Sequence, residues 1–243
     1  MHADSHNWPE AQPHGAIEEI MQDVFVVYGS MRMAPLMRIG RNMVICREGN
    51  ELTLLNPIRL SAAGEAELAG LGRVTNIVRL GCFHGLDDRY YVERFGAPFW
   101  CQPGSTHHPE PAPAIELSDD ADLPIRGARL MIFRAARSPE CAVLIEREGG
   151  LLVTCDSVQH YADWKRTSLA ARLVMRYYGF AKSTLVGPLW LKYMVSQGGD
   201  VRADFARLLD WRFDQLISAH GTLLKTNAHA AVERAVQNAA FKN

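Results

Sequence analysis

Two sets of short apolar runs, each followed by segments with helical spacing, are the feature that most constrains how this chain folds. In the first half the runs contain many β-branched residues and are separated by turn signals such as Glu48-Gly49-Asn50, a pattern that predicts strands. The predicted strands are residues 23–29, 41–46, 52–56, 74–80 and 98–101, and the predicted helices are 62–71 and 89–95.

The second half starts again with strands and ends in helices. The predicted strands are residues 128–134, 141–147 and 151–155, and the predicted helices are 164–178, 201–217 and 228–240. The helix at 201–217 is predicted because apolar residues recur there every three to four positions, among them Phe205, Leu209 and Phe213. Two strand-rich halves, each covered by helices, predict an α/β fold built as a four-layer αββα sandwich around one shared core.

The length of 243 residues suits one large domain, which we place at residues 23–243. Residues 1–22 are predicted to be a partly ordered lead-in, because the first fifteen are polar and contain two prolines and three histidines. The alternative is a short arm that docks on the body. No basic segment followed by an apolar stretch opens the chain, so a secretory signal is not predicted.

The composition excludes some classes of partner. Lys and Arg number 26 against 27 Asp and Glu, so the net charge is -1, and neither a nucleic-acid partner nor an anionic membrane is predicted, although local basic patches stay open. The five cysteines are scattered without CxxC spacing. They predict buried, reduced thiols and therefore a cytoplasmic protein.

Residues 185–195, LVGPLWLKYMV, are apolar but too short to span a bilayer and contain Pro188 and Lys192. A lid, a core helix and a partner-binding surface are the alternatives, and a homodimer, if one forms, is predicted to use this stretch. The aromatic residues between Trp164 and Tyr193 leave the same choice open, between the core of a helical layer and a hydrophobic lid or dimer surface.

Three short segments at predicted strand ends carry side chains that bind metals: residues 83–89, 153–157 and 218–221. Imidazole and carboxylate ligands delivered from such loops are the usual way in which an α/β scaffold builds a catalytic metal site. Each segment alone is ambiguous. An Asp after a strand often caps the next helix, and a His-Gly pair often ends an element.

The order of these segments resembles that of the metallo-β-lactamase-fold hydrolases. That family has a His-x-His-x-Asp-His motif after a strand, a later lone His, a Gly-rich hairpin leading to a metal-bridging Asp, and a final His-Gly. Here His84 and Asp88 have the spacing of the first His and the Asp of the motif. Residues 148–156 resemble the hairpin that ends in the bridging Asp, and residues 217–221 resemble the last ligand. The resemblance implies a sandwich of the metallo-β-lactamase type.

The departures from the family pattern concern three imidazoles. Leu86 stands where the second His of the motif belongs, and Arg89 stands where its last His belongs. Residues 135–138 contain no counterpart of the lone His. A full two-metal site of the family's kind is therefore not expected, and Arg89 is expected to repel a second cation.

The resemblance implies that His84, Asp88, Asp156 and His220 hold one divalent metal, zinc before iron or manganese, because a catalytic site needs only about three protein ligands and a water. Asp88 is then the predicted catalytic residue, which orients or deprotonates the water. His160 is a candidate substitute ligand. The alternative is a metal-free protein in which Asp88 and Asp156 pair with Arg89.

Two functions stay open on the sequence. The first is a metal-dependent hydrolase with an altered single-metal site and an unidentified small-molecule substrate. The second is a non-catalytic protein of the same fold that binds a small anion or another protein, with Arg89 and Arg137 as candidate anion contacts. Leu86 and Arg89 favour the second function, whereas the four retained ligand residues favour the first.

Overall fold

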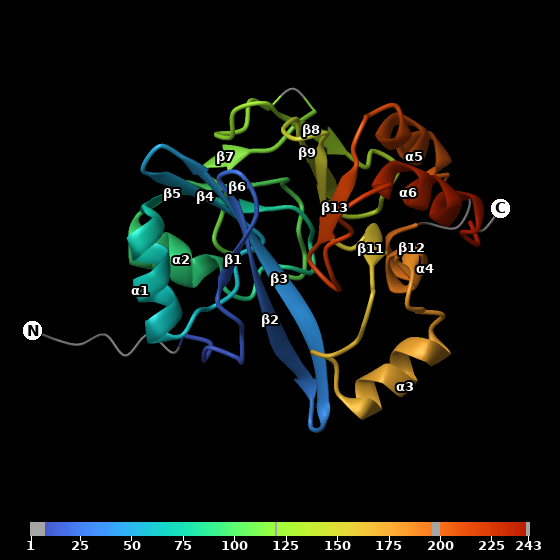
Figure 1. The fold of residues 1–243 in the computed structure, drawn as a ribbon, viewed down its shortest axis with the longest axis horizontal. Helices are drawn as coiled ribbons and strands as arrows, with labels where there is room; N and C mark the ends of the chain where they lie inside the picture. Colours follow the sequence, from blue (N-terminus) through green and yellow to red (C-terminus); the bar gives the residue numbers. More distant parts are fainter. Residues whose placement is uncertain (1–7, 120, 196–199, 242–243) are drawn as a thin grey trace, which may run out of the picture.

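Two β-sheets lie face to face, with helices on both outer sides (Figure 1). The computed structural model describes residues 8–119, 121–195 and 200–241. One sheet is built by the first half of the chain and the other by the second half. The layers therefore follow the order helix, sheet, sheet, helix.

The larger sheet has seven strands in the order in which they occur in the chain. The first four pair antiparallel, and β4, β5, β6 and β7 pair parallel. These strands are β1 (Ile17–Met21), β2 (Val24–Ala34), β3 (Met37–Glu48), β4 (Glu51–Leu55), β5 (Arg73–Arg79), β6 (Phe99–Cys101) and β7 (Ile115–Glu116).

The second sheet has four strands in the order β13-β10-β9-β8. Its strands are β8 (Ala128–Ile132), β9 (Cys141–Ile145), β10 (Leu151–Thr154) and β13 (Gln215–Ser218). β10 and β13 run parallel, whereas the other pairs are antiparallel. A separate two-stranded ribbon is formed by β11 (Val158–His160) and β12 (Thr184–Val186).

Six helices complete the described part of the chain: α1 (Ala62–Leu71), α2 (Asp88–Phe95), α3 (Leu169–Tyr177), α4 (Pro188–Met194), α5 (Arg202–Leu209) and α6 (Ala228–Gln237). α1 and α2 cover the larger sheet, and α4, α5 and α6 cover the smaller one. α3 lies apart from these layers, beside the end of the β2–β3 hairpin (Figure 1).

The alternation of side chains along the strands creates the layers. In β2, Val24 and Val26 face the core between the two sheets, whereas Phe25 and Val27 face α1 and α2. In β9, Val143 faces the same central core while its neighbours face α4 and α5. Because both faces of these strands are buried, their sequences are continuously apolar.

One predicted helix is wrong in its second part. The helix predicted at 201–217 ends at Leu209, and Gln215–Ser218 forms β13. The apolar spacing continues through this segment because Leu216 and Ile217 face opposite sides of the second sheet, in the two cores. The backbone amides of Asp214 and Gln215 donate to the carbonyl of Gly150, at 3.0 and 3.1 Å, which starts the strand beside β10.

Two other boundaries differ from the prediction. The region 1–22, predicted as a partly ordered lead-in, contributes β1 to the edge of the larger sheet, while residues 1–7 lie outside the described residues. The helix predicted at 164–178 begins only at Leu169, because the side chain of Ser168 accepts a hydrogen bond from the Ala171 amide and caps the helix there.

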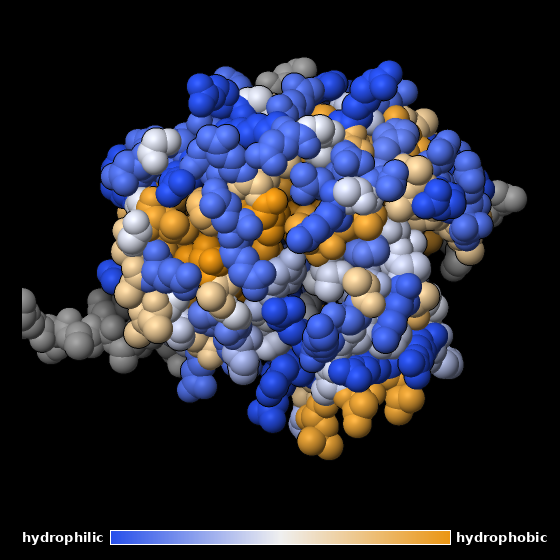
Figure 2. Space-filling view, viewed as in Figure 1, coloured by the Kyte–Doolittle hydropathy of each residue, from blue (hydrophilic) through white to orange (hydrophobic). Residues whose placement is uncertain are grey.

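All five cysteines are buried and free. Across residues 8–119, 121–195 and 200–241, none of the helices has the length and apolar character needed to cross a bilayer. The surface in Figure 2 is largely hydrophilic, but apolar residues gather left of its centre and also protrude at its lower edge, over the β2–β3 hairpin tip and α3.

Candidate metal centre

Parallel pairing of β10 and β13 brings Asp156 and His220 together. Thr154 of β10 pairs with Ser218 of β13. Asp156 follows Thr154 by two residues, and His220 follows Ser218 by two residues. The carboxyl ends of parallel strands meet at one edge of a sheet, where α/β proteins bind their ligands. The pairing continues past the strands, because the Ala219 amide donates to the Thr154 carbonyl at 3.1 Å.

His84 reaches the same point from the other sheet. It lies in the loop after β5, and this loop is fastened to the start of β9 by backbone hydrogen bonds from Cys141 to Leu80 (2.8 Å) and from Cys82 to Pro139 (2.9 Å). The two sheets therefore meet where the loop begins. His84 is buried there.

The three side chains converge on one another. His84 Nε2 lies 3.4 Å from Asp156 Oδ2, and His220 Nε2 lies 3.3 Å from Asp156 Oδ1. The two Nε2 atoms are 3.1 Å apart. Each residue thus directs one potential ligand atom to a common point, within 4.8 Å of the others.

The hydrogen bond that orients His220 fits a cation between the two histidines. His220 Nδ1 donates to the Gly40 carbonyl at 2.6 Å, which leaves the lone pair of Nε2 directed toward His84 and Asp156. His84 Nδ1 is buried and, in the described part of the chain, has no hydrogen-bond partner. Two imidazole nitrogens and a carboxylate are a donor set that zinc accepts. The residues present therefore fit a single divalent metal.

The protonation states favour metal binding as well. Burial lowers the pKa of His84 to about 4, so its imidazole is neutral near pH 7. For Asp156, burial alone would raise the pKa, but the positive charges that His84 and His220 carry when protonated, and the hydrogen bonds that they then donate, outweigh burial and lower the pKa well below its usual range. Neutral imidazoles and an ionised carboxylate are the forms that bind metal ions.

Polar side chains hold two of the three candidate ligands in place. Gln159 donates to Asp156 Oδ1 at 3.2 Å and accepts from the hydroxyl of Tyr161 at 2.7 Å. Asn42 donates to the carbonyls of Ser218 (2.8 Å) and Gly221 (3.2 Å), on both sides of His220. These contacts fix the side chain of one ligand and the backbone of the other.

The backbone directly after His220 requires a glycine. Its φ is +85°, and a Cβ atom here would lie 2.1 Å from the carbonyl oxygen of His160. A larger residue would push the loop away from β11. The close approach therefore positions His220.

An apolar cleft of about 460 Å³ opens over the three ligands. His84, Asp156 and His220 lie among its lining residues. The rest of the lining is mostly apolar and comes from the β2–β3 hairpin, α3 and α4, including Met31, Met33, Met37, Ile39, Val174, Met175, Leu189 and Tyr193. The arrangement places a polar, metal-binding group at one wall of a hydrophobic cavity.

No protein-family model matches this chain, and no curated protein sequence does. Solved structures do match. The metallo-β-lactamase VMB-1 aligns with 95% of this chain and 100% of its own at a TM-score of 0.65 and 11% sequence identity. The chain has the metallo-β-lactamase fold.

Two further metallo-β-lactamase structures agree. DIM-1 aligns with 96% of this chain and 100% of its own, at a TM-score of 0.63 and 8% identity. FIM-1 from Pseudomonas aeruginosa, solved in a mono-zinc form, aligns with 94% of this chain and 97% of its own, at a TM-score of 0.61 and 11% identity. The αββα sandwich predicted from the sequence is confirmed, and at these identities the likeness concerns the fold alone.

Asp88 is not brought to the three converging side chains of this metallo-β-lactamase-fold protein. It is fully buried at the start of α2, and its Oδ2 lies 3.3 Å from a guanidinium nitrogen of Arg79, at the end of β5. The sequence spacing gave no sign that Asp88 would lie beside this buried arginine. Asp88 therefore takes no part in the site that we propose below.

The other predicted contacts also lie outside the group. His160 pairs through Nδ1 with the Thr184 hydroxyl, at 2.9 Å. Arg89 is exposed on α2 and pairs with Glu93 at 2.6 Å, so it does not stand beside a metal position. Arg137 is exposed, its backbone amide donates to the Met194 carbonyl, and it does not line the cleft.

Glu140 is a buried residue that the sequence interpretation missed. Its Oε1 accepts hydrogen bonds from the backbone amides of Asp156 (2.9 Å) and Ser157 (2.8 Å). Burial first, and then the nearby charge of Asp156, raise its pKa well above the usual range. Glu140 therefore shapes the turn that presents Asp156. The sequence feature that could have indicated this role is an acidic residue directly before the apolar run 141–145.

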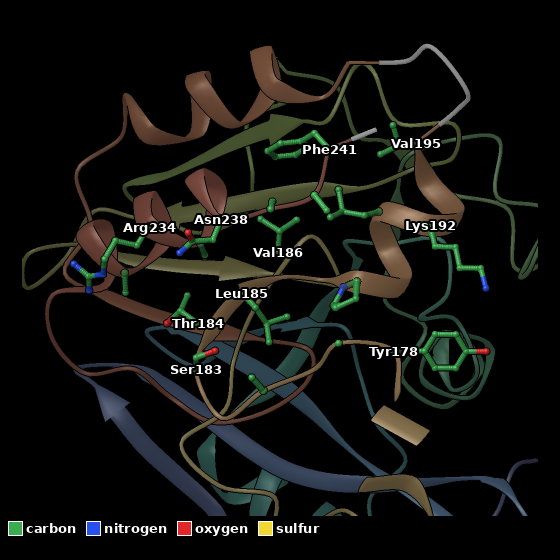
Figure 3. A pocket seen from close by; sticks show the side chains of 18 residues that line it. Tyr178, Ser183, Thr184, Leu185, Val186, Lys192, Val195, Arg234, Asn238 and Phe241 are labelled. Atoms are coloured by element: carbon green, nitrogen blue, oxygen red, sulfur yellow. The ribbon is translucent and has the colours of Figure 1, made fainter. Parts of the chain in front are cut away.

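A larger hollow of about 780 Å³ lies elsewhere, between α4, β12 and α6 (Figure 3). Leu185, Val186 and Phe241 give it an apolar lining, with Arg234 and Asn238 at one side. It contains none of the three converging ligands. Residues 185–195 contribute to it, and a homodimer through this stretch stays a prediction.

Proposed function

We propose that this protein is a hydrolase that works with a single divalent metal held by His84, Asp156 and His220. The observation that carries the proposal is the convergence of two Nε2 atoms and one carboxylate within hydrogen-bonding distances of one another. Nitrogen and oxygen donors of this kind favour zinc. The mono-zinc form of FIM-1 supports the idea that this fold accommodates a single zinc.

When bound, the metal supplies a Lewis acid that polarises a substrate carbonyl or phosphoryl oxygen and activates a water molecule. The chain itself supplies the remaining requirements. Asp156 contributes the negative charge of the site, and Gln159 fixes its orientation. The mostly apolar walls surround the ligands with groups of low polarity, which strengthens electrostatic interactions there. A substrate with an apolar portion suits this cleft.

The alternative function, an anion-binding module without catalysis, has less support. It depends on Arg89 and Arg137, and neither side chain lines the cleft. The buried arginines of the region, Arg41 and Arg79, are already paired with Asp87 and Asp88. No arginine or lysine is among the described residues that line the cleft, so the cleft offers an anion no guanidinium or ammonium group.

We expect the purified protein to bind close to one equivalent of zinc. His220→Ala and Asp156→Ala should each weaken binding more than about 100-fold, because even the outer-shell partners of metal ligands are worth about 10–100-fold in affinity. Titration with a chromogenic chelator gives the affinity, and elemental analysis gives the stoichiometry. His160→Ala is the matched control, since this histidine lies nearby but outside the group, and it should bind like the wild type.

The catalytic part of the proposal has its own measurement. Hydrolysis of p-nitrophenyl esters with acyl chains of increasing length should require zinc and should be lost in His220→Ala. Zinc binding without zinc-dependent hydrolysis of esters, thioesters or phosphodiesters would contradict the proposed hydrolase activity but would still support the metal site. A folded chain that neither binds nor is stabilised by zinc, iron or manganese would contradict both the hydrolase activity and the metal site.

A further inference from the structure

Large apolar side chains protrude from two neighbouring segments at one edge of the molecule. The β2–β3 hairpin exposes Met33 and Leu36 at its tip, and α3 exposes Leu169, Leu173 and Tyr177. These five residues are called the apolar rim below. Leu36 is 81% exposed and Tyr177 86%, although large apolar side chains are usually buried. Figure 2 shows apolar atoms protruding at this edge, below a hydrophilic band.

Hydrogen bonds join the two segments of the rim into one surface. The Ser168 amide donates to the Arg38 carbonyl at 3.0 Å, and the Ser168 hydroxyl donates to the Leu36 carbonyl at 2.8 Å. Ser168 is also the residue that caps α3. The hairpin tip therefore determines where the helix begins, and the exposed residues of both segments are held together.

Leu36 is not only exposed but also has an unfavourable backbone conformation. Its φ is +64°, in the left-handed region where glycine or asparagine is usual and a leucine is strained. A turn selected only for folding would place glycine here. Leucine at this position strains the backbone and exposes apolar surface to water. This indicates that the side chain of Leu36 serves to contact another molecule.

Helix α3 presents a continuous apolar stripe to solvent. Leu169, Leu173 and Tyr177 are spaced four residues apart and lie on one face of the helix. Ala171 and Met175 lie on another face, where Ala171 is buried and both line the cleft. The outer stripe is not needed for packing, because the inner face already holds the helix on the protein.

The two segments that carry the rim contain only basic charged residues. Residues 164–194 contain no Asp or Glu, and residues 30–40 contain none either. The basic residues of these two segments are Arg32, Arg38, Lys165, Arg166, Arg172, Arg176, Lys182 and Lys192. Lys165 is partly neutralised by Asp163, at 3.2 Å. The two segments that carry the rim are therefore basic, in a chain whose net charge is -1.

We propose that the apolar rim docks on the surface of a lipid bilayer that contains anionic headgroups. An amphipathic helix with Leu and Tyr on one side and Arg and Lys beside them is typical of segments that lie in the membrane interface. Anionic headgroups attract the basic residues, and the apolar tips enter the boundary between headgroups and acyl chains. This docking does not depend on the metal site.

A second copy of this chain is a poorer occupant. A symmetric dimer through the rim would bring identical basic segments together, and residues 30–40 and 164–194 contain no carboxylate to pair with them. The cleft supports the lipid surface. Met33 belongs both to the rim and to the cleft lining, and α3 contributes residues to both, so the cleft begins at the docking surface.

Sedimentation of the full chain with vesicles tests the proposal. Vesicles made of equal parts of phosphatidylcholine and phosphatidylserine should bind the protein, and salt should weaken the binding. Vesicles of phosphatidylcholine alone should bind markedly less. The double variant Leu173→Ser, Tyr177→Ser should lose about tenfold or more in affinity. Ile115→Ser, another exposed apolar residue distant in the sequence from the rim, should bind like the wild type.

Leu36→Gly separates docking from folding. Glycine relieves the positive φ, so this variant should unfold at a higher temperature and yet bind the mixed vesicles less tightly. Equal binding to both kinds of vesicle, or unchanged binding by both rim variants, would overturn the proposal. So would a wild-type dimer in sedimentation velocity that the rim variants dissociate, combined with no vesicle binding.

Discussion

Replacing Asp87 by alanine is expected to lower the free energy of unfolding by about 3–5 kcal/mol, because it leaves a buried arginine without its partner. Arg41 and Asp87 are 2.6 Å apart, and each side chain is only 4% exposed. The second guanidinium nitrogen of Arg41 donates to the Pro57 carbonyl at 3.0 Å, so the arginine cannot turn toward solvent without losing that bond. Chemical denaturation measures the loss.

Glu51→Ala is the matched control for Asp87→Ala. Glu51 pairs with Arg73 at 3.1 Å, but both side chains are exposed, and we expect a change of at most about 1 kcal/mol. The two variants remove the same kind of group from pairs that differ in burial. A loss for Asp87→Ala no larger than that for Glu51→Ala would mean that the buried pair does not stabilise the fold.

The buried pair also supports the candidate metal centre. Asp87 belongs to the loop that carries His84, and Arg41 follows Gly40, whose carbonyl accepts the hydrogen bond from His220. The ion pair therefore fastens the His84 loop to β3, the strand that orients His220. We expect Asp87→Ala to weaken zinc binding in addition to stability, although Asp87 is not a ligand.

The layers of the fold were predictable because burial has a strong sequence signature. Strands with two buried faces require continuous apolar runs, and residues 141–145 and 151–154 are of this kind. The same reasoning failed at β13. A short strand buried on both faces and a buried helical turn have the same composition, so only the pairing with β10 decides between them.

The candidate site was only partly predictable from spacing. Asp156 and His220 follow strands that pair in parallel, so their meeting depends on sheet topology that the resemblance to a known fold supplied. Asp88 has the expected spacing from His84, but its side chain is attracted to Arg79. Sequence spacing places a residue in a loop. It does not determine which buried charge the side chain meets.

Metal-free His84→Gln is expected to be less sensitive to acid than the wild type. Burial lowers the pKa of His84 in the folded chain to about 4 from its ordinary value of 6.5. Between these two values the unfolded chain binds a proton that the folded chain does not, so the contribution of His84 to stability falls as the pH decreases from 6.5 to 4. Glutamine has no such proton. The difference in unfolding free energy between the two proteins should change by about 3 kcal/mol across this range.

The difference between variants is needed because Asp88 acts in the opposite direction. Burial raises its pKa to about 7 from 3.8, against the effect of Arg79 and Arg41, so its contribution to stability decreases as the pH rises from 3.8 to 7. In the wild type the two effects partly cancel. Urea titrations of the wild type, His84→Gln and Asp88→Asn at several pH values, with a chelator present, separate them. A constant difference between the wild type and His84→Gln would mean that His84 is not held neutral by burial. That result would also remove the reason to expect a preformed neutral ligand for the metal.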